Sequence, residues 1–169
     1  MKKLILMLML FAPMTMFAQQ AKFGHCDTQQ IMTAMPEFIK ARADVEVVQK
    51  QKEDELKAMQ DEFQRKVEEY QKTQSTMNES KRKETEENLA QMQQKLQQTY
   101  QDGSQEIEKI SQEKMAPIRQ KLINAIQAVG KAGGYVYIMD INSGIPYVST
   151  TLSKDVTTEI KAQDRKSVV

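Results

Sequence analysis

The apolar residues between positions 36 and 129 recur every three or four residues, in two stretches separated by a short polar segment. Such spacing places apolar side chains on one face of a helix. The stripe of the first stretch, with two polar members, is Val45, Val48, Lys52, Leu56, Met59, Phe63, Val67, Tyr70, Gln74 and Met77. It predicts a long amphipathic helix that begins at Pro36 or Glu37, because proline is favourable at the first helical position.

The second stretch repeats its apolar pattern at intervals of eleven residues. Its stripe is Thr85, Leu89, Met92, Leu96, Tyr100, Gly103, Ile107, Ile110 or Ser111, Ile118 and Val129. An eleven-residue repeat corresponds to about 3.67 residues per turn and predicts arms that are nearly straight or coil slightly to the right. Each arm would be about 60–70 Å long, which a compact domain of this size could not enclose. We therefore predict a helical hairpin over residues 36–117 that projects into solvent, with its tip near residues 75–82.

Two residues interrupt the second arm. Gly103 lies in mid-helix, where glycine costs roughly 1 kcal/mol relative to alanine. Pro117 removes a backbone donor and is expected to kink or offset the helix. Each residue is a candidate hinge. The alternative for Gly103 is a close approach of the two arms, and the alternative for Pro117 is a static bend.

The sequence on either side of the hairpin predicts a small body built from residues 19–35 and 118–162. Its expected strands span residues 22–27, 135–139 and 145–149. The second of these strands is continuously apolar, which is typical of a strand covered on both faces. Asp155 is expected to cap a last short helix, and residues 163–169 are expected to form a frayed tail.

A sheet of about three short strands leaves unpaired edges and buries too little area to be stable alone. We therefore predict that copies of the chain assemble through the body. The residues expected in this oligomer body are Phe23, Cys26, Ile126, Val129, Tyr135, Val136, Tyr137, Ile138, Met139, Tyr147 and Val148.

Residues 1–18 have the three-part pattern of a secretory signal peptide: two lysines, an apolar run and a weaker segment that ends at Ala18. The apolar run is too short for a comfortable membrane span. We expect cleavage after Ala18 and export of the mature chain to the periplasm. The alternative, an uncleaved anchor, would require a longer apolar run.

The charges of the mature chain are balanced. Without Lys2 and Lys3, the 24 basic residues become 22, against 23 acidic residues, which gives a formal net charge of −1. This balance gives no argument for nucleic acid as a partner. The one local basic cluster, residues 81–83 at the tip, is followed at once by Glu84, and we interpret it as a solvated tip. Weak contact with anionic lipid is the alternative.

The sequence contains no recognisable catalytic, metal or cofactor motif. His25 and Cys26 are adjacent in a predicted strand, so their side chains point to opposite faces and cannot form a dyad within one chain. Paired cysteines, HExxH, G-x-S-x-G and a glycine-rich phosphate loop are all missing. We therefore expect neither an enzyme nor a cofactor or metal site.

Short segments on either side of the hairpin carry a further signal. They are the strand at 22–27, the link Met35-Pro36-Glu37-Phe38, the glycine-containing segment at 128–140, and the segments at 146–148 and 155–157. In this order, around a long hairpin rich in Glu, Lys and Gln, they resemble the Skp/OmpH family of periplasmic chaperones. The resemblance covers nearly the whole mature chain, although the hairpin itself carries little information.

The resemblance implies an α+β, mostly α fold: a homotrimer in which a small β-barrel-like body carries three helical arms around a cavity. It also implies an ATP-independent holdase that binds unfolded outer-membrane proteins and prevents their aggregation. The near-neutral mature chain departs from the strongly basic members of the family, which leaves long-range attraction of acidic clients or anionic lipid without support here.

Flexible methionine and aromatic side chains on the stripe can adapt to many clients. The candidate client contacts are Met59, Phe63, Tyr70, Met77, Met92 and Tyr100. The same residues lie at the seam between the arms, and we favour seam packing for most of them. Two other classes stay open: an envelope structural or adaptor coiled coil with a fixed partner, and a prefoldin-like chaperone, against which the signal peptide argues because prefoldins are cytosolic.

Overall fold

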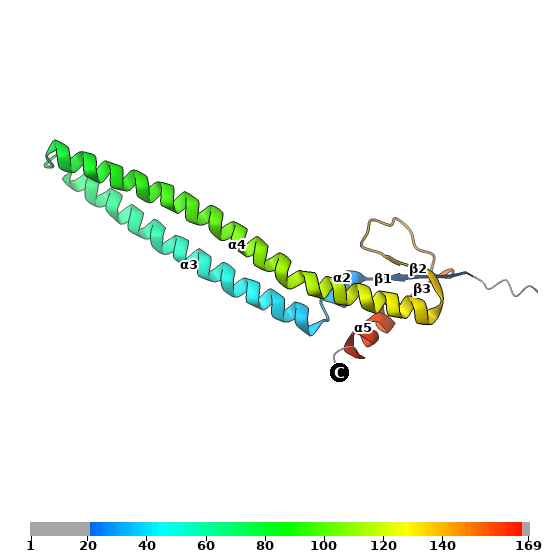
Figure 1. The fold of residues 1–169 in the computed structure, drawn as a ribbon. Helices are drawn as coiled ribbons and strands as arrows, with labels where there is room; N and C mark the ends of the chain where they lie inside the picture. The colour runs from blue at the N-terminus through cyan, green and yellow to red at the C-terminus, as the bar shows by residue number, and fades with distance from the viewer. Residues whose placement is uncertain (1–20, 167–169) are drawn as a thin grey trace, which may run out of the picture.

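The computed structural model describes residues 21–166, so the signal peptide expected at residues 1–18 lies outside the described residues. Its elements in chain order are β1 (Lys22–Cys26), α2 (Thr28–Met32), α3 (Pro36–Thr73), α4 (Glu79–Gly133), β2 (Tyr135–Asp140), β3 (Ser153–Asp155) and α5 (Thr157–Lys166). Figure 1 shows α3 and α4 as a long hairpin, with the remaining elements gathered beside the inner part of α4. The predicted fold class, mostly helical with a small sheet, is confirmed.

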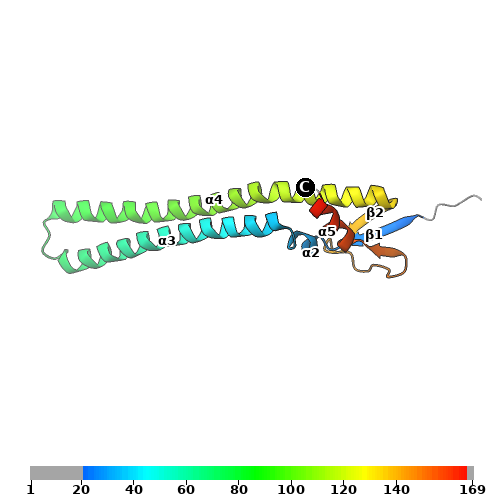
Figure 2. The same cartoon turned by 90° about the horizontal axis from the view of Figure 1, so that it is seen from below.

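The arm is the hairpin of α3 and α4. Pro36 occupies the start of α3, where its missing N–H would have had no helical partner. At the tip, the side chain of Asn78 accepts a hydrogen bond from the backbone N–H of Lys81 (2.8 Å) and so caps α4. With 38 and 55 residues, the two helices are about 57 Å and about 83 Å long. Both views show them side by side, with α4 continuing past the start of α3 into the body (Figures 1 and 2).

Pro117 does not break the second helix. It lies inside α4, which continues from Glu79 to Gly133. The helix curves gently in this region (Figure 1), and the hinge at Pro117 stays a prediction. Ile118, directly after the proline, and Leu122, about one turn further on, are buried. Their packing holds the helix in place, so the arm and the body share one continuous helix.

The sheet of the body is parallel, with the strand order β2-β1-β3. The strand predicted at residues 145–149 is wrong, because residues 141–152 contain no strand and the third strand is β3. A strand returning directly from β2 would need the free edge of β2, since β1 occupies the other edge. Instead the chain crosses to the far side of β1, where it forms β3, which pairs with β1 in parallel.

The prediction that the strand at 135–139 is covered on both faces is also wrong for the single chain. Tyr135 and Ile138 pack against the core. Val136, Tyr137 and Met139 remain 63%, 48% and 45% exposed. β2 is therefore an edge strand that leaves several apolar side chains largely exposed, although the ring of Tyr137 is partly covered by Phe23.

The core of the body lies where α2, α4 and α5 meet the sheet. Its fully buried side chains are Cys26, Ile31, Val156 and Ile160, whereas Met35 is buried in a second cluster with Ala41 and Ile118. Asp155 ends β3, and its carboxylate accepts a hydrogen bond from the N–H of Thr157 at the start of α5 (2.9 Å). The sequence predicts a frayed tail over residues 163–169. This prediction is wrong for residues 163–166, because α5 continues to Lys166 and Asp164 is buried.

Candidate functional site

The seam between α3 and α4 contains most of the predicted stripe. Its members are half-buried, and between residues 42 and 102 no residue is fully buried. The physical reason is that the arm is two helices thick, so each side chain at the seam is covered from one side only. Side chains at the seam therefore remain accessible along the length of the arm.

Five of the six candidate client contacts lie at this seam as half-buried side chains; they are Met59, Phe63, Tyr70, Met77 and Met92. The sixth, Tyr100, is 64% exposed, so its predicted place on the stripe is wrong. The neighbouring Thr99 occupies the seam instead. The spacing from Leu96 through Thr99 to Gly103 is three and then four residues, which follows the seam more closely than a strict eleven-residue repeat does.

Gly103 lies where the two arms come close together. It is buried, and a Cβ added to it would lie 3.7 Å from side-chain carbons of Lys52, which is ordinary contact. The stem of Lys52 thus covers the glycine, while its amine binds Glu106 on α4 (2.8 Å). This is the close approach that we set out as the alternative for Gly103. The hinge at Gly103 stays a prediction.

Polar bonds join the two helices at several points along the seam. Lys114 binds Asp44 (2.7 Å), and near the start of α3 Lys121 binds Glu37 (2.5 Å). Near the tip, the hydroxyl of Tyr70 donates a hydrogen bond to the carboxylate of Glu86, which raises the pKa of Tyr70. The partners lie 16 to 84 residues apart in sequence, so the sequence alone did not indicate these pairs.

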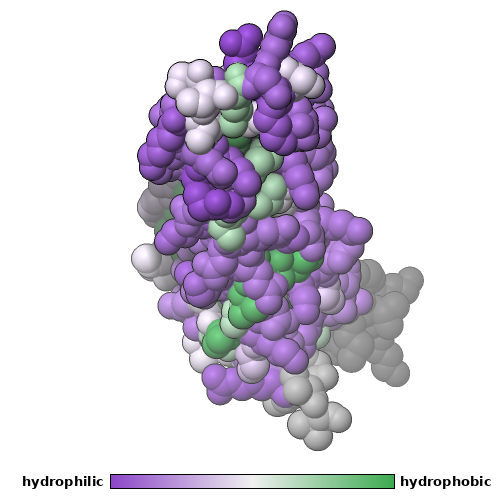
Figure 3. Space-filling view, turned by 90° about the vertical axis from the view of Figure 1, so that its left-hand side faces the viewer, coloured by the Kyte–Doolittle hydropathy of each residue, from purple (hydrophilic) through white to green (hydrophobic). Residues whose placement is uncertain are grey.

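The outer half of the seam forms a groove. Its half-buried side chains are Tyr70, Met77, Thr85, Leu89 and Met92, and the volume of the groove is about 540 Å³. A second groove of about 360 Å³, lined by Met59 and Leu96, adjoins it through the shared residues Met92 and Lys95. Figure 3, which views the molecule from the tip, shows a strip of apolar residues between hydrophilic flanks. The sequence pattern indicated Lys81, within the basic cluster 81–83, but not that it shares a groove with Lys66 and Lys95, because these lysines come from both helices.

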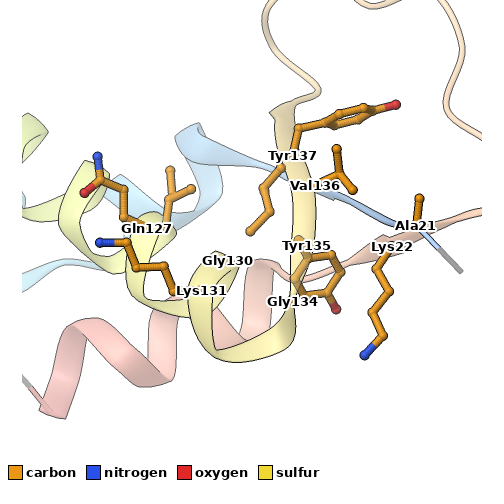
Figure 4. A pocket seen from close by; sticks show the side chains of 11 residues that line it. Ala21, Lys22, Gln127, Gly130, Lys131, Gly134, Tyr135, Val136 and Tyr137 are labelled. Atoms are coloured by element: carbon orange, nitrogen blue, oxygen red, sulfur yellow. The ribbon is translucent and has the colours of Figure 1, made fainter. Parts of the chain in front are cut away.

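The body exposes a second apolar surface, around β2 and the loop 141–152. Tyr147 and Leu152 on the loop are 78% and 73% exposed. The ring of Tyr137 stacks at a tilt on Phe23, with 4.9 Å between the ring centroids. An open pocket of about 700 Å³ lies between β2 and the inner end of α4 (Figure 4). Of its two lysines, Lys22 lies beside the ring of Tyr135, and Lys131 lies across the pocket near Gln127 (Figure 4).

The residues predicted for the oligomer body fall into three groups by exposure. Cys26 is buried. The half-buried group comprises Phe23, Ile126, Val129, Tyr135, Ile138 and Val148. The exposed group comprises Val136, Tyr137, Met139 and Tyr147. If these residues form an oligomer interface, a second copy of the chain would have to cover the exposed group.

The polar groups of the body serve the sheet. Burial, together with the nearby carboxylate of Asp140, raises the pKa of Cys26 to about 11, so the thiol stays protonated at neutral pH. His25 hydrogen-bonds through Nδ1 to the hydroxyl of Ser153, which ties β1 to β3 (2.9 Å).

Within residues 21–166, no group of three His, Cys, Asp or Glu residues is placed to hold a metal ion. No helix in this part of the chain has an apolar stretch long enough to cross a membrane.

Comparison with known proteins agrees with this architecture. No curated protein matches the chain. A crystal structure from Caulobacter crescentus CB15, described as a "putative outer membrane chaperone (OmpH-like)", has the same fold, with a TM-score of 0.73, 15% sequence identity, and coverage of 86% of this chain and 85% of that one. The model of the family "Outer membrane protein (OmpH-like)" matches residues 22–163. This match spans the body and the whole arm, and the chain belongs to the OmpH-like family.

Proposed function

We propose that this protein is an ATP-independent periplasmic holdase, which binds unfolded outer-membrane proteins between helical arms and prevents their aggregation. The observation that carries the proposal is the seam of the arm, whose apolar side chains are half-buried and open to solvent over residues 42–102. Many weak contacts along such a surface suit clients that have no fixed shape. Family membership and the description of the Caulobacter crescentus protein support a chaperone.

The proposal includes a homotrimer. β2 has one free edge and exposes the apolar residues Val136, Tyr137 and Met139, which a soluble monomer would rarely leave so accessible together. Pairing between copies would cover these residues and bring three arms around one cavity. The arms would then surround the client, while the body holds the copies together.

The proposal also includes cleavage after Ala18 and action in the periplasm, because the expected signal peptide precedes the first described strand directly. We assign no nucleic-acid partner and at most weak contact with anionic lipid at the tip, since the mature chain is near neutral. No step of this mechanism needs a catalytic residue.

The test is to dilute an outer-membrane barrel protein from urea, without ATP, into buffer that contains the purified mature chain. We expect light scattering by the diluted protein to fall as the mature chain is added. Unchanged scattering would contradict the holdase. If the chain instead binds one folded envelope protein and leaves scattering unchanged, it is an adaptor coiled coil.

A further inference from the structure

The outer groove of the arm has a basic rim around its apolar side chains. Three exposed lysines line it: Lys66 from α3, and Lys81 and Lys95 from α4. Between them lie the half-buried side chains of the groove, among them Met77 and Met92. Side chains from both helices are needed to make this arrangement, so it exists only in the folded hairpin.

These lysines are available to a ligand. Lys66 and Lys81 each contact a glutamate three residues along their own helix, Glu69 at 3.7 Å and Glu84 at 3.1 Å. Such exposed pairs contribute little and exchange readily with solvent. Lys95 makes no ion pair with any residue of 21–166. All three amines can therefore turn toward a bound anion at little cost.

The acidic groups around the groove do not cancel this rim. Glu69 is the only carboxylate that lines the larger groove. Glu86 accepts the hydrogen bond of the Tyr70 hydroxyl, and Glu62, which lines the adjoining groove, is held by Arg65 at 2.6 Å. The groove is thus locally positive, although the mature chain as a whole is near neutral.

We propose that this groove binds segments of unfolded polypeptide in which carboxylates alternate with apolar side chains. The inference rests on the proposed holdase function and names the kind of client segment that its arm prefers. Methionine side chains accept apolar groups of varied shape, and the lysine rim supplies charge complementarity for the carboxylates. The groove continues along the seam into the adjoining groove, so the two together are elongated. This shape fits an extended polypeptide, whose successive side chains point in alternating directions.

The test uses the full mature protein and two dye-labelled peptides, one that alternates Leu with Asp and a twin with Asn in place of Asp. By fluorescence anisotropy we expect the Asp peptide to bind about tenfold more tightly, as three exposed charge contacts would allow. This preference should weaken in high salt. It should disappear in the triple variant Lys66→Gln, Lys81→Gln, Lys95→Gln.

The matched control replaces three exposed lysines of the arm that do not line the groove, Lys57, Lys72 and Lys83, also with Gln. It removes the same net charge and should keep the preference for the Asp peptide. Equal binding of the two peptides to the wild type would overturn the inference. So would a preference that survives in the triple variant or is lost equally in the control.

Two further measurements separate the possible failures. Vesicles containing anionic phospholipid that bind through these lysines, while the Asp peptide does not bind, would assign the groove to lipid and overturn the inference. If the wild type suppresses aggregation of the barrel protein but does not distinguish the peptides, the holdase stands and the groove inference falls. If the peptides are distinguished but aggregation is unchanged, the proposed function falls instead. Circular dichroism checks that the variants keep their helices.

Discussion

In the body, the side chains of Ile31, Val156 and Ile160 are completely buried, whereas between residues 42 and 102 the arm has no buried residue. The body packs α2, α4 and α5 around a small parallel sheet. The arm packs one helix against another, with cross-seam ion pairs such as Lys52 with Glu106. One chain thus joins a region with a defined core to a region that keeps its apolar side chains accessible.

This difference separates two tasks. A packed body can hold copies of the chain in one arrangement, because close packing tolerates few alternatives. A half-solvated seam can exchange contacts with a client at little cost, because its side chains gain little from the partner helix alone. Substitutions in the two regions should therefore have effects of different size and kind.

The largest effect on stability is expected in the body. Ile160→Ala removes a fully buried side chain and should lower the free energy of unfolding by about 2–5 kcal/mol. The matched arm variant Leu96→Ala, at a half-buried position, should cost about 1 kcal/mol. Urea denaturation followed by circular dichroism, at equal protein concentration, compares the two. Equal losses would show that the arm is packed as tightly as the body.

The next effect is on function. Met77→Ser together with Met92→Ser makes two side chains of the outer groove polar and should weaken suppression of client aggregation, while the helices remain folded. Each substitution should lower the free energy of unfolding by only about 1 kcal/mol, because the methionine side chain is only half-buried at the seam. Light scattering during dilution of an unfolded barrel protein measures the first effect, and circular dichroism the second. Full suppression by a folded double variant would show that these methionines only pack the seam.

A smaller effect is expected where the arm meets the body. Lys121 binds Glu37 at the start of α3 (2.5 Å) and the buried Asp164 on α5 (3.3 Å). Lys121→Met should therefore lower the free energy of unfolding by about 1–2 kcal/mol at neutral pH. The hydrogen bond from Lys121 holds the pKa of the Glu37 carboxyl below its usual value. The stability that this carboxylate contributes is present above its ordinary pKa and is lost as the pH falls through the lowered one.

The measurement is urea denaturation of the wild type and of Lys121→Met over a series of acidic to neutral pH values. The difference between the two proteins should shrink as the pH falls. A difference that is constant, or that grows toward low pH, would mean that the ion pair with Glu37 does not stabilise the junction.

The smallest effect is expected at Gly103. A methyl group there meets Lys52 at an ordinary 3.7 Å, so Gly103→Ala should stabilise the arm by roughly 0.5–1 kcal/mol. If Gly103 also serves as a hinge, the stiffer arm should hold a narrower range of client sizes. Aggregation assays with one small and one large barrel protein measure this range. Equal capture of both clients by the variant would count against the hinge.

The sequence predicted the features that depend on neighbours along one helix. The stripe places α3 and α4, and Pro36 marks the start of α3. The sequence pattern placed Gln74 and Tyr100 wrongly on the stripe. Each is exposed and lies one position away from a half-buried residue, Thr73 and Thr99, because the spacing of the seam departs from eleven. The basic rim of the groove depends on how the two helices align, which periodicity along one helix does not determine.

The body was harder to predict because its pairing is not local. The segment 145–149 has the composition of a strand, but the edge of β1 is taken by β3 instead. The apolar run of β2 suggested a strand covered on both faces, and within one chain that cover is missing. Both errors concern the surface where we propose that copies of the chain meet.

The most direct test of the central claim is the mass of the client complex. Native mass spectrometry of the mature chain, mixed without ATP with an unfolded outer-membrane barrel protein, should show three copies of the chain with one client. A monomeric mass in the presence of a client that aggregates as it does alone would contradict the account.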